Sequence, residues 1–137
     1  MESRISIISL GVSDLANSTA FYRNGLGLKL RDNESNSYIS FFQLNSFLLA
    51  LYPSELLAAD AGVPHQKSVF SGITLAHNVG SKKEVDDILE SAYNANAVIT
   101  KSAEIKSWGG YSGYFKDPDG YLWEIAWNPS LVVDNVP

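Results

Sequence analysis

Cysteine is absent from the 137-residue chain. A disulfide framework, a thiolate nucleophile and a cysteine metal site are therefore excluded. Long apolar runs are also missing, because no segment reaches the roughly 20 residues needed to cross a bilayer. Residues 1–4 show no secretory signal pattern before the first apolar stretch. We expect a cytoplasmic protein with no membrane partner.

Basic residues are few. Ten Lys and Arg stand against fifteen Asp and Glu, which gives a formal charge of -5. No stripe of basic side chains follows any segment, so we expect no nucleic-acid partner. Acidity together with many aromatic residues favours a small uncharged or cationic ligand. A chain of this length buries roughly two thirds of its unfolded surface, which is enough core for a single domain.

The segment 108–129 is the most informative part of the chain. Residues 117–120, Asp-Pro-Asp-Gly, suit the successive positions of a type I turn that closes a bulged hairpin. We predict antiparallel strands over 111–116 and 121–128 on either side of it. Side chains alternate across a strand, so Trp123 and Ile125 face the core while Glu124 faces water or a cavity.

Helix caps divide the chain into two similar halves. Ser13 and Asp14 predict a helix over 15–23, and the capping box Ser81–Glu84 predicts a second helix whose apolar residues follow helical spacing. The caps at 13 and 81 are 81 - 13 = 68 residues apart, about half the chain. The pattern, though not the identity, of a strand, a helix and three strands is repeated.

The predicted fold class is α+β, with paired β-α-β-β-β modules forming a cupped, barrel-like mixed sheet around a ligand space. Module one covers about 1–53, a linker with a short helix over 54–59 covers about 54–71, module two covers about 72–129, and a tail covers 130–137. The remaining strands are expected at 5–12, 28–31, 38–44, 47–52, 72–76 and 97–100.

Two motifs carry a resemblance to a known family. They are L-G-V-S-D-L at 10–15, followed by F-Y at 21–22 and L-G-L at 26–28, and K-D-P-D-G-Y-L-W-E-I at 116–125. In these motifs and their spacing the chain resembles the vicinal oxygen chelate superfamily, which includes glyoxalase I, extradiol dioxygenases and bleomycin-resistance proteins. The W-G-G-Y-S-G-Y-F hairpin is similar to small glyoxalase-like members.

The resemblance implies a divalent metal held by one residue from each of four strands. Carried onto this chain, the positions are Glu124, Ile7, about Leu49 and about Gly72. Three of these offer no side-chain oxygen or nitrogen, whereas a catalytic metal site needs about three protein ligands. His65 and His77 do not fall on these positions. We therefore expect no metal and no cofactor.

The binding residues that we predict are Glu124, Trp108, Tyr111, Tyr114, Ile7, Leu49 and Gly72. Glu124 is either an inward carboxylate that recognises a ligand, or a salt-bridged residue that remains from the implied metal site without a binding role. The three aromatic residues either form a flexible lid around the Gly109-Gly110 hinge or pack as a hairpin end. No catalytic residue is assigned.

The leading hypothesis is a metal-independent protein that binds and sequesters a small molecule in an apolar aromatic cavity with one carboxylate anchor. The alternative is a metal-dependent lyase or dioxygenase of the same superfamily with a non-standard site, so whether the chain is an enzyme stays open. A third hypothesis is an interaction module with a collapsed interior. The resemblance and the apolar hairpin also lead us to expect a homodimer.

Overall fold

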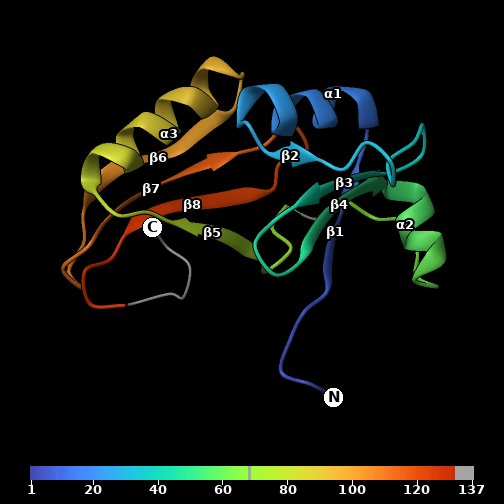
Figure 1. Cartoon of the computed structure of the whole chain (residues 1–137), viewed down its shortest axis with the longest axis horizontal. Coiled ribbons are helices and arrows are strands. Elements are labelled where there is room, and N and C mark those ends of the chain that lie inside the picture. Colours follow the sequence, from blue (N-terminus) through green and yellow to red (C-terminus); the bar gives the residue numbers. More distant parts are fainter. Residues whose placement is uncertain (68, 132–137) are drawn as a thin grey trace. The chain divides into compact units, whose positions relative to one another are not determined.

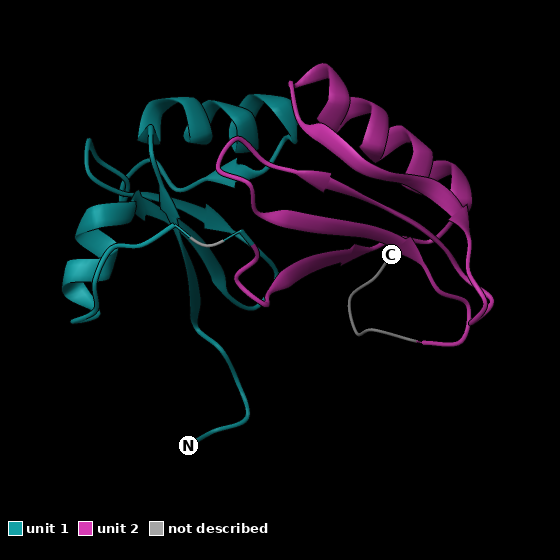
Figure 2. Cartoon of the chain, turned by 180° about the vertical axis from the view of Figure 1, so that it is seen from behind, with its two compact units in different colours: residues 1–69 teal, residues 70–137 magenta. Residues whose placement is uncertain are grey.

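The computed structural model describes residues 1–67 and 69–131. The chain divides into two compact units, unit 1 over Met1–Val69 and unit 2 over Phe70–Pro137 (Figure 2). The boundary lies inside the connection predicted over 54–71. Most of the predicted tail, residues 132–137, lies outside the described residues.

Unit 1 contains a strand, a helix and three further strands, followed by a short helix (Figure 1). Its elements are β1 (Ile7–Val12), α1 (Leu15–Ala20), the wide helical turn η1 (Phe21–Gly25), β2 (Lys29–Leu30), β3 (Ser40–Gln43), β4 (Leu48–Pro53) and α2 (Ser54–Asp60). The Asp14 side chain accepts a hydrogen bond from the Asn17 amide at 2.9 Å, as expected of a helix N-cap.

The helix predicted over 15–23 is an α-helix only as far as Ala20. After Ala20 the backbone widens, and the Leu26 amide donates to the Phe21 carbonyl five residues back at 2.9 Å. Phe21 and Tyr22 are both buried there, with their rings edge to face at 5.2 Å. The hydrophobic spacing predicted the helix but carried no signal for this wider turn.

The sheet of unit 1 has the order β1-β4-β3-β2, and β1 runs parallel to β4. One face carries the core, because Phe42 and Leu49 are adjacent on it and the Tyr22 ring lies 5.9 Å from that of Phe42. We call this the helix face of unit 1. The opposite face carries Ile7 and Leu48, which are paired in register, and we call it the Ile7 face.

Unit 2 repeats the plan with a longer helix (Figure 1). Its elements are β5 (Thr74–Asn78), α3 (Lys82–Asn94), β6 (Val98–Ile105), β7 (Tyr111–Lys116) and β8 (Leu122–Trp127). Ser81 caps α3, since its side chain accepts from the Glu84 amide at 3.2 Å and its hydroxyl donates to the Glu84 carboxylate at 2.9 Å. Strand β5 begins two residues later than predicted, and β6 continues to Ile105.

The sheet of unit 2 has the order β5-β8-β7-β6, with β5 parallel to β8. Its helix face carries the buried Phe115 and Ile125, under Val85 and Leu89 of α3. The Lys82 ammonium lies over the Trp127 ring on that side, 5.4 Å from its centroid. The opposite face carries Glu124, and we call it the Glu124 face. The predicted alternation of β8 is confirmed.

The turn between β7 and β8 forms as its sequence predicts. The Gly120 amide donates to the Asp117 carbonyl at 3.1 Å, and Gly120 has a φ of 88°, which favours glycine. The buried Asp117 carboxylate accepts from the amides of Asp119 and Tyr121 at 2.9 and 2.8 Å. The turn therefore explains why the motif has aspartate at 117 and glycine at 120.

The prediction of an α+β fold built from paired β-α-β-β-β modules is confirmed. The two sheets are separate and open within the described residues, because no strand ladder joins them, so the expected barrel-like closure is absent.

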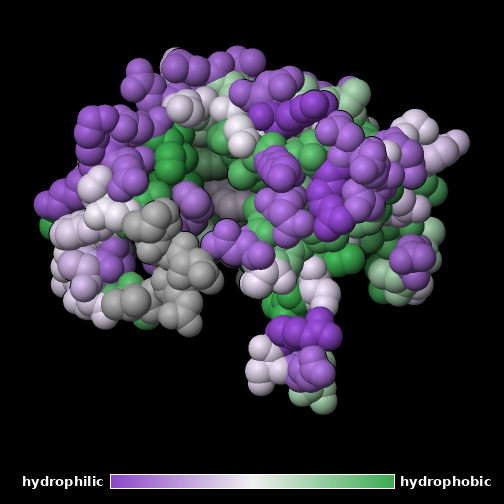
Figure 3. All heavy atoms as spheres, in the orientation of Figure 1, coloured by the Kyte–Doolittle hydropathy of each residue, from purple (hydrophilic) through white to green (hydrophobic). Residues whose placement is uncertain are grey.

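Hydrophilic residues dominate the outer surface over α3 (Figure 3). No helix in the described part of the chain is both long and apolar enough to cross a membrane.

Candidate functional site

Glu124 lies in the interior of the unit 2 sheet, on the face opposite α3. Its strand neighbours in register are Ala76 on β5 and Tyr114 on β7. Because paired residues point to the same side of a sheet, Tyr114 and Glu124 share the Glu124 face. The Glu124 residue is partly exposed. The strand pairing therefore brings together two of the predicted binding residues.

Tyr114 and Glu124 interact electrostatically on this face. Partial burial raises the pKa of Tyr114, and the Glu124 charge and its hydrogen bond with the phenol raise it further, while the Lys101 charge opposes them. The phenol therefore keeps its proton well above neutral pH. Glu124 has a tyrosine partner, and among the described residues it forms no ion pair, so the salt-bridged alternative has no cation to support it.

The cation nearest to this pair in register is engaged elsewhere. Lys101 is opposite Tyr114 on β6, and its ammonium lies 3.1 Å from the Glu104 carboxylate. Lys106 contacts the same carboxylate oxygen at 2.7 Å. Hydrogen bonding and charge from Glu104 raise the pKa of Lys101, and the two lysines lower the pKa of Glu104. The Lys101–Glu104 pair is more than half exposed, so it adds little stability.

Ser112 is a second polar residue on the Glu124 face. It pairs in register with Ala126 of β8 and is fully buried, with no hydrogen-bond partner for its hydroxyl among the described residues. A buried hydroxyl without a partner costs about 1–3 kcal/mol. The sequence analysis missed Ser112. The alternation of β7 alone places it on the same face as Tyr114, two residues away.

Leu49 does not lie where the sequence prediction placed it. It is 1% exposed on the helix face of unit 1, so it belongs to the core and is not available to a ligand on the Ile7 face. Leu48, Ala50 and Tyr52 are the β4 residues that share the face of Ile7. Side-chain alternation makes a one-residue error in register an error of face.

Ile7 and Gly72 lie at the beginnings of edge strands. Ile7 is 46% exposed at the start of β1 and pairs with Leu48. Gly72 precedes β5, whose first residue is Thr74. Neither position supplies a side-chain donor atom. Both remain predicted binding positions that contribute only apolar surface or backbone.

The aromatic residues predicted as one lid lie in different places. Tyr111 points to the helix face, where its hydroxyl donates to the Asp86 carboxylate of α3 at 2.7 Å, and this hydrogen bond raises the pKa of Tyr111. Tyr114 lies on the opposite face. The Trp108 ring lies against Gly110, where a Cβ atom would be 1.7 Å from it. The hairpin end is thus packed locally, and the three side chains form no common lid.

The donor set does not fit the family's metal. Within residues 1–67 and 69–131, no three His, Cys, Asp or Glu side chains are grouped closely enough to hold a metal ion. Glu124 is the carboxylate at the implied positions, and the others are hydrocarbon or glycine. His77 lies on the helix face in register with Ile125, where partial burial lowers its pKa and the Glu84 charge opposes the shift.

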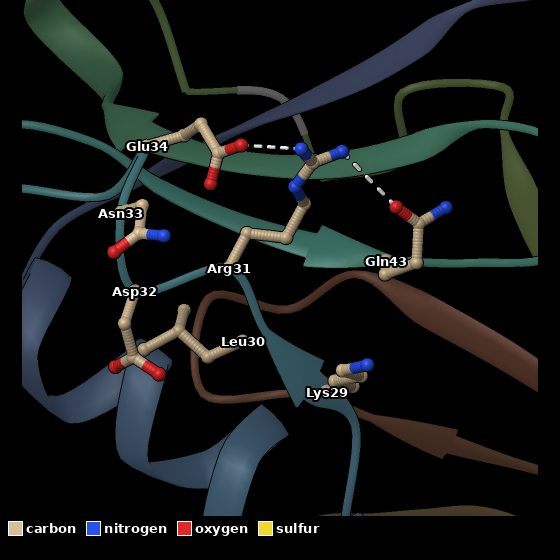
Figure 4. A pocket seen from close by; sticks show the side chains of 7 residues that line it. All are labelled: Lys29, Leu30, Arg31, Asp32, Asn33, Glu34 and Gln43. Carbon is tan, nitrogen blue, oxygen red and sulfur yellow. Dashed lines mark hydrogen bonds and ion pairs between the residues drawn. The ribbon is translucent and has the colours of Figure 1, made fainter.

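A polar groove of about 520 Å³ lies at the β2 edge of unit 1 (Figure 4). Its centre is Arg31, which pairs with the Glu34 carboxylate and donates to the Gln43 side-chain oxygen at 3.2 Å. Lys29 and Gln43 pair in register on the Ile7 face. Lys29 forms no ion pair with another described residue. The sequence analysis missed this groove because its residues come from a turn and two strands.

The two β-α-β-β-β units, each with a parallel outer pair of strands, define a fold that known families share. The model of the Glyoxalase/Bleomycin resistance protein/Dioxygenase superfamily matches residues 4–125, and the chain belongs to this superfamily. The resemblance of the two sequence motifs is thereby confirmed.

Individual relatives agree with this assignment. A glyoxalase-related enzyme from Fulvimarina pelagi is 35% identical with a TM-score of 0.89, and the match covers 98% of this chain and 94% of that one. The metallothiol transferase FosB of Lysinibacillus sphaericus is 28% identical over 88% of this chain and 79% of its own length. A lactoylglutathione lyase from Agrobacterium tumefaciens, 24% identical, matches 92% of this chain and 94% of its own with a TM-score of 0.69, which shows the shared fold.

Proposed function

We propose that this protein binds and sequesters a small molecule without a metal ion. The observation that supports the proposal is the asymmetry of the implied ligand positions. Glu124 keeps a carboxylate, partnered by Tyr114, while Ile7 and its neighbour Leu48 on the same face are hydrocarbon. One carboxylate does not hold a divalent cation against water, but it does anchor an organic ligand.

The Tyr114–Glu124 pair supplies a donor and an acceptor side by side. A carboxylate has two oxygens and about four lone-pair directions, so Glu124 can accept from Tyr114 and from a ligand hydroxyl, amine or amide at the same time. Apolar and aromatic side chains would provide most of the contact area. We assign no catalytic step to these residues.

A thermal-shift screen of the full chain against aromatic and cationic compounds tests the proposal. A compound that raises Tm is then titrated into Glu124→Gln, which keeps the side-chain shape and removes the charge. We expect its affinity to fall about tenfold, because a charge-assisted hydrogen bond is lost. Glu55→Gln on α2 removes an exposed carboxylate in unit 1 and should leave binding unchanged. A screen with no shift for any compound would count against the proposal, as would equal affinities of the two variants.

A metal-dependent lyase or dioxygenase is the second candidate. What favours it is that relatives carry the names metallothiol transferase and lactoylglutathione lyase. It requires a non-standard site in which backbone carbonyls, water or substrate complete the coordination around Glu124. Such a protein would retain a stoichiometric metal ion after purification, whereas the binding protein would not.

We also propose that the protein acts in the cytoplasm as a homodimer. Strand β1 lies at the edge of its sheet, and both Ile7 at its start and Ile5 just before it are exposed. An apolar edge strand offers a surface for a second copy. Light scattering during size-exclusion chromatography should give twice the mass of one chain, and Ile7→Lys should shift it to a single chain. A wild-type mass of 15.0 kDa would contradict the proposal.

A further inference from the structure

A second groove, of about 360 Å³, lies on the helix side of unit 2, where α3 passes over strands β6 and β7. We call it the α3–β6 groove. It is lined by Asp86, Leu89, Glu90, Tyr93, Ile99, Ser102, Ala103 and Tyr111. Tyr111 lies on the opposite side of β7 from Tyr114, so this groove is on the other face of the sheet from Glu124. Its volume falls within the range of small-molecule sites.

The groove has an apolar floor and an acidic rim. Leu89, Ile99 and Ala103 are buried or half-buried and form the floor. Asp86 and Glu90 are four residues apart on α3, so their carboxylates lie on one side of the helix above that floor. Strand β6 changes register on both sides of Lys101, and such bulges bend an edge strand locally.

The residues that line the groove carry a net negative charge. No lysine or arginine is among the lining residues. The Lys83 ammonium on the same helix pairs with Asp87 at 2.6 Å, outside the groove. Glu90 forms no ion pair with another described residue, and Asp86 accepts the Tyr111 hydroxyl, which fixes the carboxylate without neutralising it. A cation entering here would meet two carboxylates.

An exposed aromatic ring completes the groove. Tyr93 is one turn beyond Glu90 on α3, and its side chain is 67% exposed. A tyrosine face attracts an ammonium group, and a ring beside an apolar floor accepts an alkyl or aromatic body. We propose that the α3–β6 groove binds small organic cations that carry an aromatic or alkyl group. This site is separate from the Glu124 face and does not depend on its function.

The test is a titration of the ¹⁵N-labelled full chain with 2-phenylethylammonium chloride, followed by amide NMR shifts. We expect saturable shifts, with affinity on the order of millimolar for so small a probe, confined to α3 and β6. The neutral analogue 2-phenylethanol has the same ring and chain length. It should bind several-fold more weakly, since it lacks the charge.

Two matched variants separate local recognition from net charge. Glu90→Gln and Asp87→Asn each remove one negative charge from α3, but only Glu90 lines the groove. We expect Glu90→Gln to weaken binding of the ammonium probe about three- to tenfold, and Asp87→Asn to change its affinity by less than about twofold. Tyr93→Leu should weaken it about two- to fivefold.

Three results would overturn the proposal. The first is equal binding of phenylethanol and phenylethylammonium, which would leave an apolar groove without charge recognition. The second is equal loss in Glu90→Gln and Asp87→Asn, which would mean diffuse attraction to an acidic helix. The third is the absence of saturable amide shifts when 2-phenylethylammonium is added. Shifts that only a lysine-rich peptide produced would count in the same way.

Discussion

Units 1 and 2 have the same strand order, yet they carry different chemistry on the faces opposite their helices. The Ile7 face carries hydrocarbon side chains at Ile7 and Leu48, whereas the Glu124 face holds a carboxylate, a tyrosine and a buried serine. The helix faces are alike, each with a fully buried phenylalanine ring. The comparison teaches that the two units share the core positions that maintain the fold but differ in the chemistry of the faces opposite their helices.

The largest expected effect tests the difference between the two faces of one sheet. Phe42 is fully buried on the helix face of unit 1, while its neighbour Phe41 is half-buried on the Ile7 face. We expect Phe42→Ala, and Phe115→Ala in unit 2, to lower the free energy of unfolding by about 3–5 kcal/mol. Phe41→Ala should lower the free energy of unfolding clearly less. Urea denaturation measures all three variants, and equal losses for Phe41→Ala and Phe42→Ala would contradict the difference in burial between the two faces.

The next effect concerns the turn that positions β8 and Glu124. Asp117→Ala removes the acceptor of two backbone amides, so we expect a loss of about 1–3 kcal/mol in unfolding free energy. Asp117→Asn keeps one side-chain oxygen as an acceptor, so it should retain a substantial part of the stability that Asp117→Ala loses. Thermal denaturation compares the two variants. If they were equally unstable, the acceptor role of Asp117 would be wrong.

Two buried serines provide a smaller and sharper contrast. Ser40 in unit 1 shares a 2.7 Å hydrogen bond with Thr19, whereas Ser112 in unit 2 has no partner among the described residues. Ser40→Ala should lower the free energy of unfolding by about 1 kcal/mol, and Ser112→Ala should be neutral or stabilising. If Ser112→Ala lowered the free energy of unfolding as much as Ser40→Ala, the Ser112 hydroxyl would have a hydrogen-bond partner in solution.

The smallest effect is a shift in tyrosine titration. Tyr114 and Tyr111 have raised pKa values, the first mainly through burial with Glu124 contributing, the second mainly through its hydrogen bond to Asp86. Glu124→Gln should lower the pKa of Tyr114 and leave that of Tyr111 unchanged, which NMR of ¹³Cζ-labelled tyrosine resolves. A shift of both tyrosines, or of neither, would contradict the pairing.

The sign of the corresponding stability change follows from the raised pKa. The native state holds the phenol proton more tightly than the unfolded chain, whose tyrosines titrate near pH 10. The contribution of Tyr114 to stability is therefore constant below about pH 10 and falls as the pH rises beyond it. Glu124→Gln should make this alkaline decline shallower.

Much of the fold was predictable from local signals. The turn at 117–120, the capping box at Ser81 and the alternation of β8 are each set by neighbouring residues, so the second hairpin and α3 were predicted closely. The alternation of β8 placed Glu124 on the face opposite the core, but its position beside Tyr114 needed the strand register. The exact lengths of β5 and β6 depended on pairing across the sheet.

The rest of the site depended on register that no local signal fixes. Leu49 was assigned by counting along an apolar strand, where nothing marks which residues face the core, and a shift of one residue placed it on the wrong side. Tyr111 and Tyr114 are three apart, and an odd spacing in a strand puts them on opposite faces. The α3–β6 groove joins residues from a helix and an edge strand, which the sequence separates.

We propose that this protein binds its ligand through the Glu124 carboxylate, without a metal ion. The most direct measurement is the metal content of full-length protein purified without chelator, incubated with Zn, Ni, Mn and Fe and desalted, alongside Glu124→Gln. The account predicts far less than one metal ion per chain in both proteins. One tightly held ion per wild-type chain that is lost in Glu124→Gln would contradict it and favour the metal-dependent enzyme.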